Sequence, residues 1–407
     1  MTGAKKAVWI GGVLIALVLV GWYVFGTDSN ASASGSAGGR GPSGRLSSAT
    51  SAASGPASGV GNVGPYSAAG LQSRQEQLAL WRGRYERAEK TYASYRDATR
   101  YPYDSRPISE HPDQVRPFAP IAEELKMRSA NGDIVTGVHL RTSQERVFLS
   151  GAESVKFSVA AVDDNNQPLT LSIRSAQAQS IPDSPTPIKL VQTTVVFSDD
   201  GSGADDVSGD NVYSGRLTPA TQGFQNYGGT IRLLVEIAAD GQQGVVQFDV
   251  VYTPDVPATW AGVREALEAG SLNFYLKANV RQAGRYVVSA RVDDANGVPF
   301  ALLQFNDEMA AGSGEFKLQV FGALVLDKSP AFPLRLRDVD GFLLLPDQFP
   351  DRSMMARQPG VVYVSAVYPK SRFSATEWSS EERQRYLTEY GNDAEVARRK
   401  LEELTGQ

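Results

Sequence analysis

The chain has 407 residues, a net charge of −5 and no cysteine. Without cysteine it contains no disulfide, no thiolate metal site and no acylated lipoprotein cysteine. Only His111 and His139 are available for histidine-based catalysis or zinc binding, and the acidic balance without a Lys/Arg cluster argues against nucleic acid as a partner.

The chain begins with an uncharged run from Ala7 to Phe25, preceded by Lys5 and Lys6. At about 1.5 Å per residue the run reaches roughly 28 Å, which is enough for one bilayer crossing. The lysines predict a cytoplasmic tail at residues 1–6, an inner-membrane helix at 7–25, and a body that is periplasmic or extracellular. A cleaved signal peptide is the alternative, because residues 31–33 have the small side chains of a peptidase site, but secretory apolar cores are usually shorter.

Residues 26–70 consist mostly of Gly, Ser, Ala, Asn and Thr, with an occasional Pro. Such a composition buries too little apolar surface to offset the entropy of the chain, so we expect a disordered linker. Its r.m.s. span would be about 37 Å.

A helix is predicted over residues 71–98, because apolar side chains recur there at alternating spacings of three and four. The stripe contains Leu71, Leu78, Trp81, Tyr85, Ala88, Tyr92 and Tyr95 and is interrupted at Arg74. Tyrosine hydroxyls need partners and suit a dry coiled-coil seam poorly, so docking on the chain's own sheets is the favoured interpretation. Self-association through this helix is the alternative.

Prolines dominate the next segment, and we expect residues 99–130 to run extended over a surface. His111 lies in this segment without a second ligand at metal-binding spacing, which favours an ordinary surface histidine.

The following residues alternate apolar and polar side chains between regular turn signals. This pattern predicts two tandem immunoglobulin-like (Ig-like) β-sandwiches, at 131–255 and 275–370, in a mainly β chain. A connector at 256–274 is expected to contain a short helix near residues 260–269. The predicted strands lie near 146–150, 155–159, 170–173, 194–197, 212–217, 231–237, 245–252, 272–280, 284–292, 300–305, 314–321, 342–345 and 361–368.

Each predicted sandwich contains one copy of a repeated aspartate-rich segment. Residues 162–169 read Val-Asp-Asp-Asn-Asn-Gln-Pro-Leu, and residues 292–300 match them with one insertion. Asp and Asn favour tight turns because they bond their own backbone, so we interpret both segments as turns.

One loop of the first sandwich carries a denser group of aspartates between glycines. These are Asp199, Asp200, Asp205, Asp206 and Asp210. A structural loop, in which aspartates cap turns, is the simpler interpretation. A shared Ca²⁺ is the alternative, since calcium prefers six to eight hard oxygen ligands and the surrounding residues 131–255 carry 15 acidic and 7 basic side chains.

The run from Ser198 to Tyr213 resembles the "DDG…D…GDGVY" signature of choice-of-anchor X, a bacterial family of exported Ig-like proteins. Residues 284–297 and 321–342 are similar to the second half of that family, although Asn211 replaces an expected glycine. The resemblance covers residues 101–368. It implies a sandwich body on a variable membrane or surface anchor, and it implies no particular activity.

Helical signals return at the C-terminus, over residues 376–407. A capped start is expected at residues 379–382, and Gly391 and Asn392 are expected to separate two short helices. Ala394, Ala397, Leu401 and Leu404 form one apolar stripe, which would pack within the chain or dock on a partner.

No Gly-x-Ser-x-Gly or His-Glu-x-x-His motif occurs, and most acidic pairs lie in predicted turns, so we do not expect an enzyme. The sequence favours a membrane-tethered binding or scaffold protein of the cell envelope that holds a protein partner. The alternative function is calcium-supported recognition of carbohydrate or cell-wall polymer.

Overall fold

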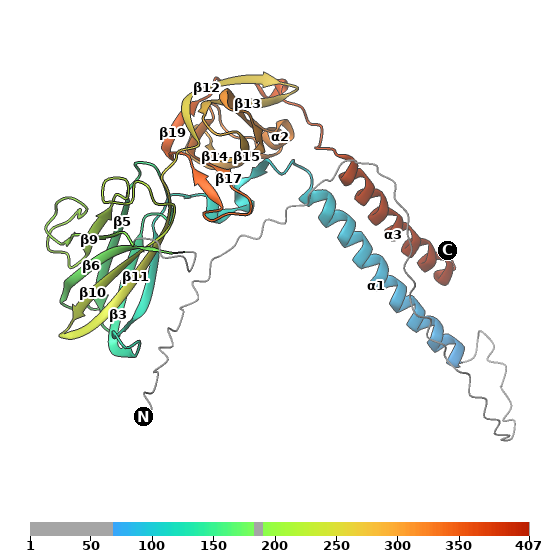
Figure 1. Ribbon diagram of the computed structural model, residues 1–407. Helices are drawn as coiled ribbons and strands as arrows, with labels where there is room; N and C mark the ends of the chain where they lie inside the picture. The colour runs from blue at the N-terminus through green and yellow to red at the C-terminus, as the bar shows by residue number, and fades with distance from the viewer. Residues whose placement is uncertain (1–67, 183–189, 407) are drawn as a thin grey trace, which may run out of the picture. The chain divides into compact units, whose positions relative to one another are not determined.

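The computed structural model describes residues 68–182 and 190–406 (Figure 1). Strands hold 45% and helices 21% of the structure, which confirms the prediction of a mainly β chain with several antiparallel sheets. The predicted tail at 1–6, the predicted membrane helix at 7–25 and the predicted linker up to residue 67 lie outside the described residues. Within them, no helix is both long enough and apolar enough to span a bilayer.

The first sandwich is built from β2 to β11. In the order β7-β6-β10-β11-β2-β3-β5-β9-β8 these strands form one continuous path, with β4 beside β11. The path is joined at β11 and β2 by one residue pair, Val245 with Arg128. The strands are β2 (Ile121–Arg128), β3 (Ile134–Gln144), β4 (Phe148–Ser150), β5 (Val155–Val162), β6 (Leu171–Ile181), β7 (Gln192–Thr194), β8 (Phe197–Ser198), β9 (Tyr213–Leu217), β10 (Gly229–Ala239) and β11 (Gln242–Thr253).

Alternating side chains of these strands make the first core. Val155, Phe157 and Val159 on β5 are fully buried, as are Ile231 and Val235 on β10. The rings of Phe157 and Phe248 meet at 4.9 Å between centroids, so β5 and β11 face one another across the core. The alternation predicted from the sequence therefore places one face of β5 and one face of β10 inside.

The second sandwich contains β1 and the strands from β12 onward. Its larger sheet has the order β1-β15-β14-β17-β18 with β19 also on β17, and its smaller sheet has the order β12-β13-β16. The elements are β1 (Ser105–Pro107), β12 (Ala258–Glu268), β13 (Ser271–Val280), β14 (Gly284–Asp293), β15 (Pro299–Met309), β16 (Gly312–Val320), α2 (Gly322–Lys328), β17 (Arg335–Leu344), β18 (Arg352–Met354) and β19 (Gln358–Val364).

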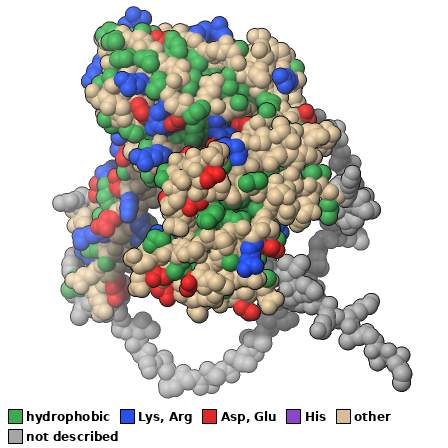
Figure 2. Space-filling view, turned by 90° about the vertical axis from the view of Figure 1, so that its left-hand side faces the viewer, with side chains coloured by type: hydrophobic (Ala, Val, Ile, Leu, Met, Phe, Trp, Pro, Cys, Tyr) green, Lys and Arg blue, Asp and Glu red, His purple; other side chains and the backbone are tan. Residues whose placement is uncertain are grey.

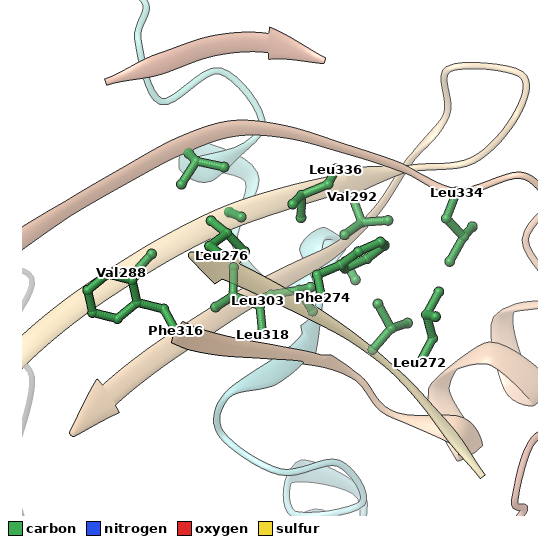
Figure 3. Close-up of a cluster of buried hydrophobic side chains, with 14 of the residues drawn as sticks. Leu272, Phe274, Leu276, Val288, Val292, Leu303, Phe316, Leu318, Leu334 and Leu336 are labelled. Carbon is green, nitrogen blue, oxygen red and sulfur yellow. The ribbon is translucent and has the colours of Figure 1, made fainter. Parts of the chain in front are cut away.

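A separate buried cluster fills the space between these two sheets. Figure 3 shows Phe274, Leu276, Phe316 and Leu318 of the smaller sheet among side chains of the larger one, such as Leu303. The Phe305 and Phe316 rings, one from each sheet, lie 5.2 Å apart in an edge-to-face contact. The body thus has two hydrophobic cores, one in each sandwich.

The helix expected near residues 260–269 is wrong, because these residues form β12. A bulge shifts the register between Trp260 and Gly262, where Gly262 has a φ of 125°. The extra residue places Trp260 and Val263 on the same side, and both pack against the second core with Leu267. The bulge thereby produces apolar spacings of three and four, which are the spacings of a helix.

The helix predicted at 71–98 is present as α1 (Ala68–Ala98), and it packs along α3 (Glu381–Thr405) (Figure 1). Tyr95, near the end of α1, contacts Tyr386 and Tyr390, near the start of α3. At the other end of the pair, Arg74 donates two hydrogen bonds to the carbonyl oxygen of Leu404. The two helices therefore form an antiparallel pair, called the helical hairpin below although no short loop joins them. Docking of α1 on the sheets was expected instead.

The expected break at Gly391 and Asn392 is also wrong, because α3 is continuous. Its capped start is confirmed: the Ser380 side chain accepts a hydrogen bond from the Arg383 amide. Glycine costs about 1 kcal/mol in a helix interior. Here the pairing with α1 offsets that cost, since Gly391 lies under the ring of Tyr92.

The proline-rich segment is more ordered than a surface-lying extended chain. Ser105–Pro107 pairs with β15 as an edge strand, and two short 3-10 helices follow at Ile108–Glu110 and Pro112–Gln114. Ile108 is fully buried. The end of the predicted extended segment forms strand β2 instead. Nearly all side chains of β2 are exposed, so the sequence lacks the alternation of apolar and polar residues by which a strand is identified.

Candidate metal centre

The aspartate-rich loop connects β8 to β9, two paired strands of the first sandwich. Gly201, Gly209 and Asn211 adopt left-handed backbone angles, with φ of 72°, 74° and 62°. The expected glycine at position 211 is thus replaced by the residue that best tolerates the same geometry. These turns fold the loop back on itself.

Folding of the loop brings three of the five predicted aspartates together. One carboxylate oxygen from each of Asp199, Asp205 and Asp210 lies within 4.8 Å of the others. Asp205 is 6% exposed, although it lies in a polar loop. Among the described residues these three form the one group of three or more carboxylate or imidazole side chains close enough to share a metal ion.

Backbone amides hold each carboxylate of the cluster in place. Asp199 accepts hydrogen bonds from the amides of residues 209, 210 and 211, at 2.8 to 3.1 Å. Asp205 accepts one through Oδ2 from the Gly201 amide, and Asp210 accepts one through Oδ1 from the Val212 amide. These bonds neutralise part of the repulsion between the carboxylates without any metal.

The cluster keeps oxygen capacity for a cation. Oδ1 of Asp205 and Oδ2 of Asp210 have no hydrogen-bond donor within the described part of the chain, and Oδ2 of Asp199, which accepts one amide, has a further lone pair. Calcium takes six to eight oxygens, so the three carboxylates would supply part of its shell and water or carbonyl oxygens the rest. The donor set therefore suits Ca²⁺ and is incomplete by itself.

Asp200 and Asp206 lie outside the cluster and bond to other side chains. Asp200 accepts hydrogen bonds from the Ser202 hydroxyl and amide, which lower its pKa. Asp206 pairs with Lys156 of β5, and that hydrogen bond lowers the pKa of the Asp206 carboxyl. The sequence predicted all five as one set because spacing along a loop does not show which side chains point inward.

Neither histidine belongs to the cluster. His139 on β3 lies 2.9 Å from an oxygen of Asp164, and His111 separates the two 3-10 helices.

The two repeated aspartate segments form the same turn in both sandwiches. Asp163 accepts hydrogen bonds from the amides of Asn165 and Gln167, and Asp294 accepts the equivalent bonds from Asn296 and Val298. The left-handed position is Asn166 in the first turn and Gly297 in the second. Turn chemistry thus accounts for both segments.

Sequence reasoning missed a second place where charged side chains meet. Arg146 and Glu153 of the first sandwich line a cavity of about 530 Å³ together with Arg357 of the second. These residues are far apart in the sequence and belong to no motif, so no local pattern could have found them.

On the face shown in Figure 2, acidic and basic side chains are interspersed with apolar ones. No broad basic surface, of the kind that binds nucleic acid, is visible on that face.

No protein-family model and no curated protein sequence matches the chain. Among solved structures, it is similar to a DUF4785 family protein from Legionella pneumophila, with 12% identity, a TM-score of 0.38, and coverage of 57% of this chain and 58% of that one. It is also similar to Escherichia coli alpha-2-macroglobulin activated by porcine elastase, with 10% identity, a TM-score of 0.19, and coverage of 55% and 23%. The chain therefore spans less than two thirds of either structure, and likenesses this weak carry no argument about function.

Proposed function

We propose that the chain is a membrane-tethered binding protein of the cell envelope, whose Ig-like sandwiches and helical hairpin hold a protein partner. The apolar run at 7–25 supports the tether, and the resemblance to the choice-of-anchor X family supports the exported location. The observation that carries the binding function is the incomplete cover of the hairpin.

The hairpin pairs two long helices without a third layer over them within the described residues. Tyr92 and Tyr95 contact α3. With Leu78, Trp81 and Tyr85 of the same stripe they remain only half-buried. Long helices in globular domains usually bury their apolar stripe against a larger core. A two-helix arm leaves part of that stripe available to another protein.

The chemistry of the hairpin suits a protein interface. Tyrosine, tryptophan and arginine are enriched at such interfaces, and α1 carries all three, with Arg84 stacked 4.6 Å from the Trp81 ring centroid. The hairpin also exposes three large apolar side chains, Leu71, Leu80 and Val396, each close to half exposed.

Photo-crosslinking in the producing cells tests this function. A photoreactive residue at Leu80 or Val396 should give one discrete crosslinked product with an envelope protein. The same probe at Glu86, an exposed residue of α1 about 120° around the helix from Leu80, is the matched control and should give little product. A product of twice the mass of the chain would identify self-association in place of a separate partner, and equal products at all three positions would overturn the proposal.

The tether is tested separately by fractionation. The full-length protein should sediment with the inner membrane and resist carbonate extraction, because a 19-residue apolar helix does not leave the bilayer at high pH. Recovery of a soluble form beginning near Ser34 would show cleavage and secretion instead.

Calcium-supported recognition is the second candidate, favoured by the cluster of Asp199, Asp205 and Asp210. If the ligand is a carbohydrate, the site requires exposed aromatic side chains near the loop. Among the described residues, the large exposed aromatic side chains are Tyr103 and Phe349, and neither belongs to the first sandwich. Calcium binding for stability or for a protein partner therefore fits better than a sugar platform.

Calorimetry with Ca²⁺ tests the metal site. If the ion binds only the folded loop, free Ca²⁺ at 100 times its Kd should stabilise the protein by about 2.7 kcal/mol, reversibly with chelator. Asp205→Asn should abolish most of this effect. Asp206→Asn removes the same charge from the same loop outside the cluster, so it should leave calcium binding within about twofold. Unchanged melting temperature at millimolar Ca²⁺ would exclude the site.

A further inference from the structure

A cavity of about 530 Å³ lies where the two sandwiches and the proline-rich segment meet. Its lining includes Phe118 of that segment, Glu145, Arg146 and Glu153 of the first sandwich, and Ala356 and Arg357 of the second. The volume falls within the range of small-molecule sites, about 300 to 1,000 Å³. The charges in this lining decide what it can bind.

The two glutamates of the cavity already have partners. Arg146 donates from Nη1 to Glu153 at 2.7 Å and from Nη2 to Glu145 at 3.0 Å. The second oxygen of Glu145 accepts from the Lys156 amide, and that of Glu153 accepts from the Ser150 amide. These carboxylates therefore fix Arg146 in place.

Two cationic donors remain unsatisfied. Nε of Arg146 is buried without an acceptor. Arg357 has no ion-pair or hydrogen-bond partner in the described residues; its guanidinium lies over the Phe118 ring, 4.8 Å from the centroid. Burial and the positive charge of Arg146 lower the pKa of Arg357, and the nearby carboxylates do not compensate.

An unpaired, half-buried guanidinium is costly, and the chain places it beside a second buried donor. Guanidinium groups bind carboxylates and phosphates through paired N–H donors. The two flanking glutamates would repel a doubly charged anion more than a singly charged one. Phe118, Ala152, Ala356 and Pro359 offer apolar contacts beside the charges.

We propose that this cavity binds an organic monocarboxylate, with the carboxylate on the guanidinium of Arg357. The apolar part of the ligand would lie against the non-polar lining. This site is independent of the helical hairpin and of the aspartate loop, so failure of either earlier proposal leaves it untouched.

Calorimetric titration of the full-length chain with N-acetyl-L-leucine tests the site, with N-acetyl-L-leucinamide as the uncharged analogue and inorganic phosphate as the competing anion. The carboxylate should bind at least tenfold more tightly than the amide and than phosphate. Arg357→Gln should weaken its binding at least tenfold. Arg335→Gln, which removes an exposed cation from the same sandwich, should change it less than twofold.

The unliganded variant gives a readout that does not depend on the choice of ligand. Because Arg357→Gln removes an unpaired cation, its melting temperature without ligand should equal or exceed that of the wild type. A lower melting temperature would show that Arg357 is a structural residue and would overturn the proposal. Equal binding of carboxylate and amide, or no binding of either, would do the same.

Discussion

Buried arginine side chains fasten the proline-rich segment to the second sandwich. Arg291 on β14 is 2% exposed and donates to both the carbonyl and the side-chain oxygen of Gln114. It also donates to the Asp338 carbonyl and to the Asp340 carboxylate. A charge this deeply buried is tolerated because each of these acceptors replaces a lost water.

Arg291→Ala should therefore destabilise the protein by about 3 kcal/mol, since it removes a buried cation and leaves a partly buried carboxylate and several acceptors without a donor. Chemical denaturation measures the loss. Arg335→Ala, at an exposed position on the neighbouring strand, is the control and should cost less than about 0.5 kcal/mol. Similar losses for the two variants would show that the network around Arg291 contributes little.

At the scale of elements, the α1–α3 hairpin depends on partners that are distant in the sequence. Arg74 interrupts the apolar stripe of α1, yet its guanidinium bonds the Leu404 carbonyl at the end of α3. A basic group at a helix C-terminus satisfies a free carbonyl and interacts favourably with the helix dipole. Arg74 thus interrupts the apolar stripe of α1 but caps the C-terminal end of α3.

Gly391 allows a direct test of the continuous helix. A Cβ at this position would lie 3.7 Å from the Tyr92 ring, an ordinary van der Waals distance. Gly391→Ala should therefore stabilise the protein by about 0.5 to 1 kcal/mol, through helix propensity alone. A higher melting temperature of the variant in thermal unfolding would confirm this stabilisation.

Gly322→Ala is the matched control for that experiment. At the first position of α2, a Cβ would collide with the Gly270 carbonyl oxygen, so this variant should be strongly destabilised. Destabilisation by Gly391→Ala would mean that α1 and α3 approach more closely than the structure indicates.

At the scale of the molecule, the hairpin is joined to the second sandwich through Asp327. Arg100, just after α1, donates two hydrogen bonds to this carboxylate, and the Tyr101 hydroxyl donates a third. Partial burial raises the pKa of Asp327, but these bonds outweigh burial and hold it below its usual value. Burial and the same carboxylate raise the pKa of Tyr101 to about 12.

This junction should weaken in acid. Because the pKa of Asp327 is lower in the folded protein than in the unfolded chain, its contribution is present above about pH 4 and is lost as the pH falls through the lowered value. Asp327→Asn should cost about 1 kcal/mol at pH 7, since the pair is partly exposed, and much less near pH 3. A cost that does not change with pH would show that the charge is irrelevant to the junction.

The sequence by itself determined the mainly β class, because alternation with a period of two is a local property that every half-buried strand must have. It also determined the existence of α1, the capped start of α3 at Ser380, and the two aspartate turns. Each of these depends on residues within a few positions of one another. The tether at 7–25 is likewise a prediction from the sequence alone.

Only the tertiary structure decided which groups meet. It selected Asp199, Asp205 and Asp210 from five aspartates, because backbone amides of the folded loop orient these carboxylates inward. It paired α1 with α3, and it turned a helix-like spacing at Trp260, Val263 and Leu267 into a bulged strand. It also brought Arg357 to Arg146. The helix pairing and the approach of Arg357 to Arg146 depend on residues distant in the sequence, and the strand at 260–268 depends on a bulge that shifts the register. The choice of aspartates depends on the path of one folded loop. None of these leaves a periodic signal in the sequence.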